Sequence, residues 1–355
     1  MFVPGVKIND AKESADENRV LAKYIPLMKE HKINLEFGRN FDSWFNDRFF
    51  GRYDIISFYE KLICDINFKQ ENDRAMKGSD GWFFYKSNGS VLNYANLKLF
   101  SEPELKLIAE YLSGINDWCE KRNKKFYFLI CPDKNKIYGE YYPGYIIKVN
   151  SDQKSRSKQL KKYLEANTAV KTVYPYETLI KNKSKGLLYF KGDTHWNSLG
   201  AYYAYMDLMD MICVDYEVER FSTGEFELRN SESFDLINMF ARSSEEDNML
   251  YKTPILKKNY TLKFVNEKHR GDESSRKEFV LDNNAGSFSV VLFRDSFSTV
   301  LLPYLGNTFG KVYSFRGNLI DETVLAGIDN RADIVILEIV ERDLVLLKNN
   351  RFIKK

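Results

Sequence analysis

The stretch of sequence that decides the fold is SFSVVLFRDSFS, at residues 287–298. Its apolar run from Phe288 to Phe293 is typical of a strand buried on both faces of a parallel sheet. The run stops at a polar triplet, and a helical pattern follows from Phe297 to Phe309. A strand that turns directly into a helix predicts an α/β protein, with Ser296 at the junction.

The same pattern extends through much of the chain. The run FYFLIC at 126–131 predicts a second buried strand, and it follows a helical pattern that starts at the N-cap candidate Ser101. Alternating strands and helices predict a mostly parallel, doubly wound sheet. The remaining predicted helices cover 152–166, 198–213 and 321–330, and the remaining predicted strands cover 171–174, 187–190, 311–315 and 333–340.

Two regions depart from this rhythm. Residues 16–66 place aromatic side chains at helical intervals, including Phe41, Trp44 and Phe45, so we expect residues 1–66 to form a helical lead-in packed on the core. Residues 219–285 are polar with short alternating pieces, which predicts an inserted irregular or β subdomain. The expected organisation is therefore a lead-in at 1–66 and a catalytic domain at 67–355 with this insertion.

Composition excludes several classes of protein. The 355 residues carry a net charge of only +3, which is too small and too dispersed for a nucleic-acid-binding protein. The cysteines have no paired spacing, so we expect no disulfide framework, no metal site and no cofactor. No apolar run reaches the ~18 residues of a membrane span, and no signal-peptide pattern is present. The four cysteines are Cys64, Cys119, Cys131 and Cys213.

The segment GDTHWN at 192–197 carries the clearest chemical signal. Asp193 lies two residues from His195, and an acid that orients an imidazole is half of a Ser-His-Asp site. Ser296 supplies the nucleophile, with its own N–H as an oxyanion donor at the start of a helix. Alone, Ser296 would be a helix N-cap, Asp193 a turn cap, and His195 a packing partner of Trp196. The conjunction favours a catalytic triad of Ser296, His195 and Asp193.

Three further side chains are candidates for substrate binding. Lys134 and Arg316 each follow the carboxyl end of a predicted strand, where α/β proteins bind ligands. Each could bind an anionic or hydroxyl-rich substrate, although a surface ion pair is the simpler interpretation. Trp196 is the third candidate, because aromatic rings stack on sugars, although most aromatic residues of this chain should be core.

Five segments together resemble a known family, the SGNH-hydrolase-like acetyltransferases of the alginate acetylation type, AlgJ and AlgX. In order and spacing they cover roughly residues 40 to 345. The segments are GSDGWFFY at 78–85, CPDKNKIYGEYYP at 131–143, GDTHWNSLGAYYAY at 192–205, RDSFSTVLLPYLGNTFGKVYSF at 294–315 and DIVILEIVERDL at 333–344.

The resemblance implies a fold and a function. It implies an SGNH-like catalytic domain with circularly permuted motif order, because Asp193 and His195 precede Ser296 here, whereas the serine comes first in ordinary SGNH hydrolases. It implies that Ser296 carries an acetyl group and passes it to a hydroxyl of a secreted or cell-surface polysaccharide, such as an alginate- or cellulose-like exopolysaccharide. A membrane-bound O-acyltransferase would be the partner that supplies the acetyl group.

The same resemblance implies an extracytoplasmic location, in the periplasm or at the cell surface, with a native N-terminal signal or anchor absent from this chain. We expect no C-terminal carbohydrate-binding module of the AlgX type, so AlgJ is the nearer pattern. Two alternatives stay open at this point. One is a carbohydrate acetyl esterase with the same triad, since water can also release the acyl group. The other is a non-catalytic glycan-binding scaffold.

Overall fold

The computed structural model describes most of the chain from residue 74 onward. The exceptions are 87–88, 98, 231–234, 240–248, 258–259, 265–277, 318–319, 321, 351 and 353–355. Before residue 74 it describes 13–14, 19–20, 22–24, 26–29, 32–34, 37, 41 and 44–45.

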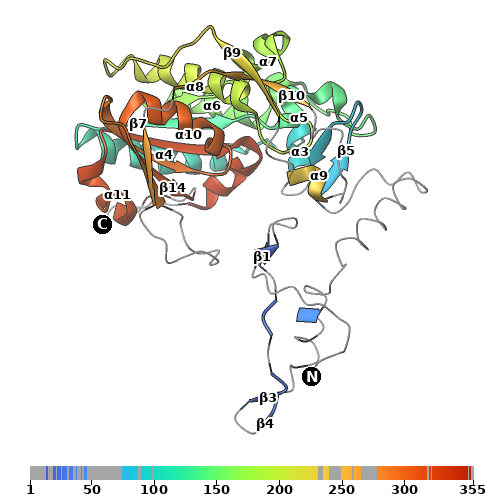
Figure 1. Ribbon diagram of the computed structural model, residues 1–355. Helices are drawn as coiled ribbons and strands as arrows, with labels where there is room; N and C mark the ends of the chain where they lie inside the picture. The colour runs from blue at the N-terminus through green and yellow to red at the C-terminus, as the bar shows by residue number, and fades with distance from the viewer. Residues whose placement is uncertain are drawn as a thin grey trace.

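A seven-stranded sheet forms the centre of the molecule, in the order β11-β12-β14-β13-β15-β7-β8 (Figure 1). The five strands from β14 to β8 are parallel, and β12 and β11 add antiparallel at the β14 edge. The parallel strands are β7 (Lys125–Cys131), β8 (Lys171–Val173), β13 (Ser287–Arg294), β14 (Phe309–Arg316) and β15 (Ile334–Val340), and the edge strands are β11 (Thr261–Phe264) and β12 (Glu278–Asp282).

Helices cover both faces of this sheet, as the prediction of a doubly wound α/β fold requires. Alternate residues of β7 pack into two separate core clusters, Tyr127 and Leu129 into one and Phe126 and Phe128 into the other. The first cluster contains α7 (Tyr176–Asn182), α8 (Ser198–Ile212) and α10 (Ser298–Thr308). The second contains α4 (Glu102–Glu120), α6 (Arg156–Asn167), α11 (Glu322–Ala326) and the 3₁₀ segment η7 (Glu341–Asn349). The predicted fold class is therefore confirmed.

The start of α8 follows from its sequence. Asn197 is the N-cap, as predicted for Asn197 or Ser198, and its Oδ1 accepts hydrogen bonds from the N–H groups of Leu199 (3.0 Å) and Gly200 (3.1 Å). Gly200 is required here, because a Cβ at this position would overlap the carbonyl oxygen of Leu188. The cap and the glycine hold the beginning of α8 against the loop that precedes it.

One predicted strand was wrong. Residues 187–190 do not join the sheet, and Tyr189 forms only an isolated bridge with Trp196. The backbone of this segment instead pairs with the segment just after it, since Asn197 N donates to Leu188 O (2.9 Å) and Phe190 N donates to His195 O (3.3 Å). Residues 187–190 therefore form the first half of a tight loop, and residues 191–195 lie at its tip.

The predicted insertion at 219–285 divides into two parts. Strands β9 (Phe226–Asn230) and β10 (Leu250–Pro254) form their own antiparallel pair, and the short helix α9 (Asp235–Met239) lies between them in sequence. Strands β11 and β12, in contrast, extend the central sheet. Half of the insertion is therefore a continuation of the core and not a separate subdomain.

Most of the predicted N-terminal lead-in lies outside the described residues, including Phe49, Phe58 and Leu62. Phe41, Trp44 and Phe45 are helical, as predicted, and the Phe41 and Trp44 rings lie 5.8 Å apart. Among the described residues, no helix is long and apolar enough to cross a membrane. The remaining elements are β1 (Glu13–Ser14), β2 (Arg19–Val20), β3 (Met28–Lys29), β4 (Lys32–Ile33), β5 (Ala75–Lys77), β6 (Phe83–Tyr85), α3 (Ser90–Tyr94), α5 (Lys134–Ile137), η1 (Gly139–Tyr141), η2 (Asp152–Lys154), η3 (Lys183–Lys185) and η6 (Asp329–Arg331).

Candidate active site

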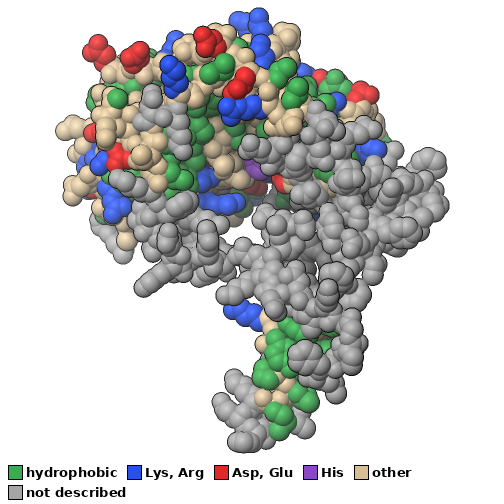
Figure 2. Space-filling view, viewed as in Figure 1, with side chains coloured by type: hydrophobic (Ala, Val, Ile, Leu, Met, Phe, Trp, Pro, Cys, Tyr) green, Lys and Arg blue, Asp and Glu red, His purple; other side chains and the backbone are tan. Residues whose placement is uncertain are grey.

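Two segments about a hundred residues apart in sequence meet beside the carboxyl end of β13. One is the loop before α8, which carries Asp193 and His195, and the other is the turn between β13 and α10, which carries Ser296. In Figure 2 histidine surface lies beside acidic side chains in a recessed part of the molecular face. Ligand sites of open α/β sheets lie outside the carboxyl ends of the strands, and this site has that position.

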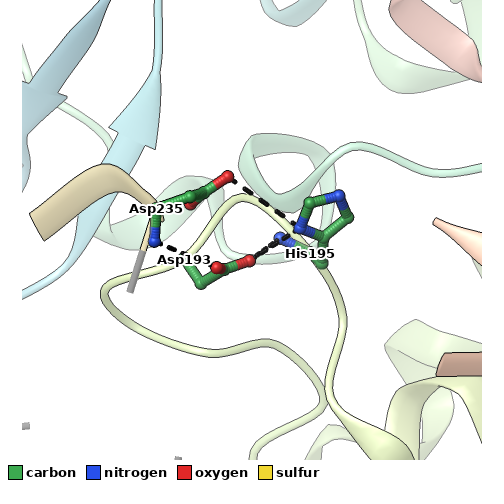
Figure 3. A group of neighbouring side chains, drawn as sticks. All are labelled: Asp193, His195 and Asp235. Carbon is green, nitrogen blue, oxygen red and sulfur yellow. Dashed lines mark hydrogen bonds and ion pairs between the residues drawn. The ribbon is translucent and has the colours of Figure 1, made fainter. Parts of the chain in front are cut away.

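The three predicted triad residues form one hydrogen-bonded chain. His195 Nδ1 lies 2.7 Å from Asp193 Oδ1, and His195 Nε2 lies 2.8 Å from Ser296 Oγ. Figure 3 shows the Nδ1 edge of the ring facing Asp193, with the other ring nitrogen directed away from it. With Nδ1–H donated to Asp193, Nε2 is the acceptor for the hydroxyl proton of Ser296, a tautomer assigned from the hydrogen-bond network.

Asp193 is fixed from all sides. Its side chain is fully buried, and Oδ1 accepts a second hydrogen bond from His195 N (2.8 Å), while Oδ2 accepts one from Asp235 N (3.1 Å). The carboxylate therefore cannot rotate without losing N–H donors that a buried charge requires. This constraint sets the plane of the His195 ring.

The pKa of His195 is raised above its usual value of 6.5. Burial of the ring acts in the opposite direction, but the hydrogen bond and charge of Asp193, followed by the charge of Asp235, more than offset it. Stronger basicity favours a group that must take a proton from a serine hydroxyl.

Asp235 is a residue of the candidate site that the sequence did not predict. Its Oδ1 accepts a hydrogen bond from Thr194 N (2.6 Å), and its Oδ2 lies 3.9 Å from His195 Nδ1 (Figure 3). Partial burial, and next the neighbouring Asp193, raise the pKa of Asp235 to about 6. In sequence Asp235 only begins a short apolar turn inside a polar insertion, and no local pattern distinguishes it from an ordinary helix-capping acid.

Asp193, His195 and Asp235 also lie close enough together to be considered as metal ligands. However, Nδ1 of His195 and Oδ1 of Asp193 are 2.7 Å apart, whereas two ligands of one tetrahedral zinc ion lie about 3.3 Å apart. Oδ1 also accepts the backbone N–H of His195. This geometry fits a directly hydrogen-bonded acid and imidazole better than a shared ion.

The turn that carries Ser296 is held by two buried or half-buried acids. Both oxygens of Asp295 accept backbone N–H groups, Oδ1 from Phe297 (2.8 Å) and Oδ2 from Val340 (2.7 Å). Oε2 of Glu338, on β15, accepts hydrogen bonds from Asp295 N (3.0 Å) and Ser298 Oγ (2.8 Å). These bonds fix the backbone on both sides of Ser296. Among the described residues, the Ser296 N–H has no hydrogen-bond partner, so it is available to an oxyanion.

Glu338 was not predicted, because its role depends on contacts with residues about forty positions away. Its side chain is fully buried, and this burial, together with the charge of Asp295, raises its pKa well above the usual range. A further unpredicted charge is Arg342, which forms an ion pair with Asp133 and stacks over the ring of Phe297 at 5.4 Å. Glu338 lies within β15, and Arg342 follows that strand.

Lys134 is buried and bound by the protein's own backbone, which corrects its prediction as a substrate-binding residue. It is only 3% exposed, and its Nζ donates to the carbonyl oxygens of Phe190 (3.0 Å), Lys191 (3.0 Å) and Asp193 (2.6 Å). An ammonium group satisfies three acceptors at once, so Lys134 holds the loop that carries Asp193 and His195. The residue sits at the predicted edge of the sheet, but it binds the protein itself.

Trp196 requires the same correction. Its side chain is fully buried, its Nε1 donates to Phe297 O (2.9 Å), and its ring packs edge-on against the Phe297 ring. The indole therefore connects the loop before α8 to the turn after Ser296. Arg316, by contrast, is exposed at the end of β14, the strand next to β13, and its substrate contact stays a prediction.

Comparison with protein families identifies the family of this chain. The family described as the SGNH hydrolase-like domain of the acetyltransferase AlgX matches residues 75–314. This range contains both segments of the site. A comparison of the sequence with curated proteins gives no match.

Comparison with solved structures finds the same fold. A DHHW family protein from Eubacterium siraeum is 18% identical with a TM-score of 0.54, over 80% of this chain and 98% of that chain. Bacillus cereus PatB1 is 17% identical with a TM-score of 0.52, over 77% of this chain and 97% of that chain. PatB1 with a sulfonyl adduct is 15% identical with a TM-score of 0.51, over 78% of this chain and 100% of that chain.

Proposed function

Because this chain belongs to the family of SGNH hydrolase-like domains of the AlgX acetyltransferase type, we propose that it is a serine-dependent O-acetyltransferase that acts on a polysaccharide. Ser296 is the nucleophile, His195 the general base and acid, and Asp193 the group that orients the imidazole. The observation that carries the proposal is the unbroken hydrogen-bonded chain from Asp193 through His195 to Ser296.

The first half-reaction loads the serine. His195 Nε2 takes the hydroxyl proton of Ser296 while Oγ attacks the carbonyl carbon of an activated acetyl ester. The tetrahedral intermediate places its negative charge on the former carbonyl oxygen, toward the Ser296 N–H and the positive end of the α10 dipole. Collapse breaks the bond to the leaving oxygen, which receives the proton from His195. The product is acetyl-Ser296.

The second half-reaction reverses the roles. A sugar hydroxyl gives its proton to His195 Nε2 as its oxygen attacks the acetyl carbonyl of acetyl-Ser296. The second tetrahedral intermediate collapses by releasing Ser296 Oγ, which takes the proton back from His195. Water in place of the sugar hydroxyl would give free acetate, so the acetyl esterase alternative uses the same residues.

We further propose the setting of this reaction from the resemblance to the alginate acetylation type. The acceptor is an exopolysaccharide, the acetyl donor is supplied by a membrane-bound O-acyltransferase, and the enzyme acts outside the cytoplasmic membrane. The proposed catalytic domain spans residues 67–355. Arg316, exposed at the carboxyl end of β14, is the proposed contact for an anionic or hydroxyl-rich acceptor.

The Ser296→Ala variant tests the nucleophile. We expect labelling by a sulfonyl fluoride to disappear and turnover of an activated acetyl ester to fall by about 10⁴-fold or more, because the attacking oxygen is gone. Such reagents react with activated serines, and PatB1 has been solved with a sulfonyl adduct. Ser287→Ala is the matched control, since Ser287 is exposed at the other end of β13. Intact mass spectrometry with peptide mapping gives the labelled position.

The same assay separates the alternatives. Incubation with an activated acetyl ester and a glycan acceptor yields acetylated glycan if the protein is a transferase. Free acetate without acetylated glycan indicates an esterase. Wild-type protein that binds glycan but never forms an acyl-enzyme is a scaffold, and retained labelling of the Ser296→Ala variant contradicts the assigned nucleophile.

A further inference from the structure

The insertion between α8 and β13 reaches the active site through its short helix α9. The N–H groups of Leu236 and Ile237 donate to the carbonyl oxygen of Gly192 at 3.1 and 3.0 Å, and both side chains are buried in a small cluster with Ala75 and Phe83. Figure 1 shows α9 lying beside β5, at the end of the molecule remote from α11. Helix α9 thus docks between the β5–β6 pair and the loop that carries the catalytic residues.

Asp235, the first residue of α9, bonds to the same loop in both directions. Its N–H donates to Asp193 Oδ2 (3.1 Å), and its Oδ1 accepts from Thr194 N (2.6 Å). The backbone of Asp235 therefore binds the Asp193 side chain, and its carboxylate binds the backbone of Thr194. The second carboxylate oxygen, Oδ2, faces His195 Nδ1 at 3.9 Å (Figure 3).

The two acids beside His195 are not equivalent. Oδ1 of Asp193 makes the direct hydrogen bond to the ring at 2.7 Å, and its Oδ2 is already bound by Asp235 N. Oδ2 of Asp235 lies beyond hydrogen-bond distance, so it acts on the ring through its charge. At 3.9 Å and in a partly buried site, that charge is only weakly screened.

We propose that Asp235 is a positioning residue which fixes the Asp193-His195 loop and supplies a second negative charge for the imidazolium formed during acyl transfer. This inference rests on the proposed function of Ser296, His195 and Asp193. It makes the insertion a part of the catalytic unit, because the docking of α9 brings this charge to the ring.

The charges around the ring give the inference a pH dependence. Asp193 on the loop and Asp235 on α9 favour the protonated ring, while Arg342 at the start of η7 opposes it. Burial, and next the charge of Asp193, raise the pKa of Asp235 to about 6. Above that pH the carboxylate of Asp235 is ionised, and its charge makes His195 a stronger base.

The Asp235→Asn variant isolates this charge, because an amide oxygen can still accept the Thr194 N–H. We expect the pH midpoint for sulfonyl labelling of Ser296 to fall by about one unit, since the imidazolium loses a stabilising neighbour. We expect the labelling rate at the pH plateau to fall about tenfold, because His195 becomes a weaker base. Asp210→Asn is the matched control, because the Asp210 side chain is 65% exposed. Asp210 lies twelve residues after Ser198 along α8, which corresponds to about 18 Å along the helix axis.

The outcomes distinguish the inference from the function on which it rests. A lowered midpoint in Asp235→Asn with an unchanged midpoint in Asp210→Asn supports the role of Asp235. If the wild type and Asp235→Asn have the same midpoint, the role of Asp235 is overturned. Labelling of Ser296 in both proteins would still support the proposed function. Wild-type protein that is not labelled at Ser296 overturns the proposed function itself.

A second measurement keeps Asp235 in place, so it can be made even if the Asp235→Asn variant does not fold. Substituting His31 and His269 by asparagine leaves His195 as the single histidine, so its ring resonances can be followed by NMR as the pH is changed. We expect the ring of His195 to titrate above its usual value of 6.5, because Asp193 and Asp235 stabilise the imidazolium. A midpoint at or below 6.5 overturns the inference.

Discussion

At the scale of single residues, Lys134 shows how a buried charge can hold the loop of a candidate active site. Its ammonium group binds three backbone carbonyls of residues 190–193 and lies over the rings of Trp82 and Phe84 at 5.6 and 5.2 Å. The loop carries Asp193 and His195, so their placement depends on a side chain of α5, which lies outside that loop.

The Lys134→Met variant tests this dependence. Methionine fills similar space but leaves the three carbonyl oxygens without this donor, so we expect the free energy of unfolding to fall by about 3 kcal/mol. We expect kcat to fall by roughly tenfold or more with a smaller change in KM, because the base is misplaced. Urea denaturation and steady-state kinetics measure the two effects.

Lys191→Met is the control for that variant, since Lys191 lies in the same loop but its Nζ bonds to Asp80 O at the surface. Equal losses of stability and kcat in the two variants would contradict a specific role for Lys134.

The sequence predicted those site residues that stand in a recognisable local pattern. Asp193 and His195 are two positions apart, and Ser296 sits at a recognisable junction of strand and helix; the structure places the three in hydrogen-bond contact. Asp235 and Glu338 were missed because each reaches the site through contacts with residues about forty positions away. Their own neighbours in sequence carry no sign of those contacts.

At the scale of elements, the start of α8 carries the loop of the active site. Asn197 caps the helix with its Oδ1 and donates from Nδ2 to Leu187 O (2.7 Å), so one side chain fixes both the helix and the strand-like segment before it. The residue just before this cap is Trp196, which is bonded to the turn after Ser296.

The Asn197→Ala variant should therefore affect both stability and activity. We expect a loss of about 1–2 kcal/mol in the free energy of unfolding, as for other N-caps, and a reduced kcat because the loop loosens. Ser155→Ala removes the N-cap of α6, on the opposite face of the sheet, and should cost stability with little change in kcat. Calorimetry and turnover on both variants provide the comparison, and a normal kcat in Asn197→Ala would argue against the link.

Elements were predictable where their pattern was long. The buried strands β7, β13 and β15 and the helices α4, α8 and α10 follow from apolar runs and capping residues. The run at 187–190 has the composition of a strand, but its backbone partners are the residues only a few positions later. An apolar run indicates that a segment is buried, but it does not indicate which segment its backbone N–H and C=O groups bond to.

At the scale of the whole molecule, buried acids make stability depend on pH. Burial, and next Asp295, raise the pKa of Glu338 well above its usual range, so the native state holds this proton at a pH where the unfolded chain has released it. The native state then binds more protons than the unfolded state, and stability falls as the pH rises above about 4.5.

The Glu338→Gln variant removes that titration. Its amide oxygen can still accept from Asp295 N and Ser298 Oγ, so we expect the loss of unfolding free energy between pH 5 and pH 8 to be smaller than in the wild type. Urea denaturation at the two pH values measures the difference. An equal or larger loss in the variant would show that Glu338 does not hold its proton in the native state.

The strand order has a consequence for how the protein is made. The last strand that the structure describes, β15, lies in the middle of the sheet between β13 and β7, so the two halves of the sheet have no common partner until residues 334–340 have been synthesised. Until then the nascent chain carries two half-sheets with open edges, a state prone to slow folding and aggregation. Pairing of β15 with both β13 and β7 therefore completes the sheet that carries Ser296 after β13 and, after β7, Lys134, which binds the loop of Asp193 and His195.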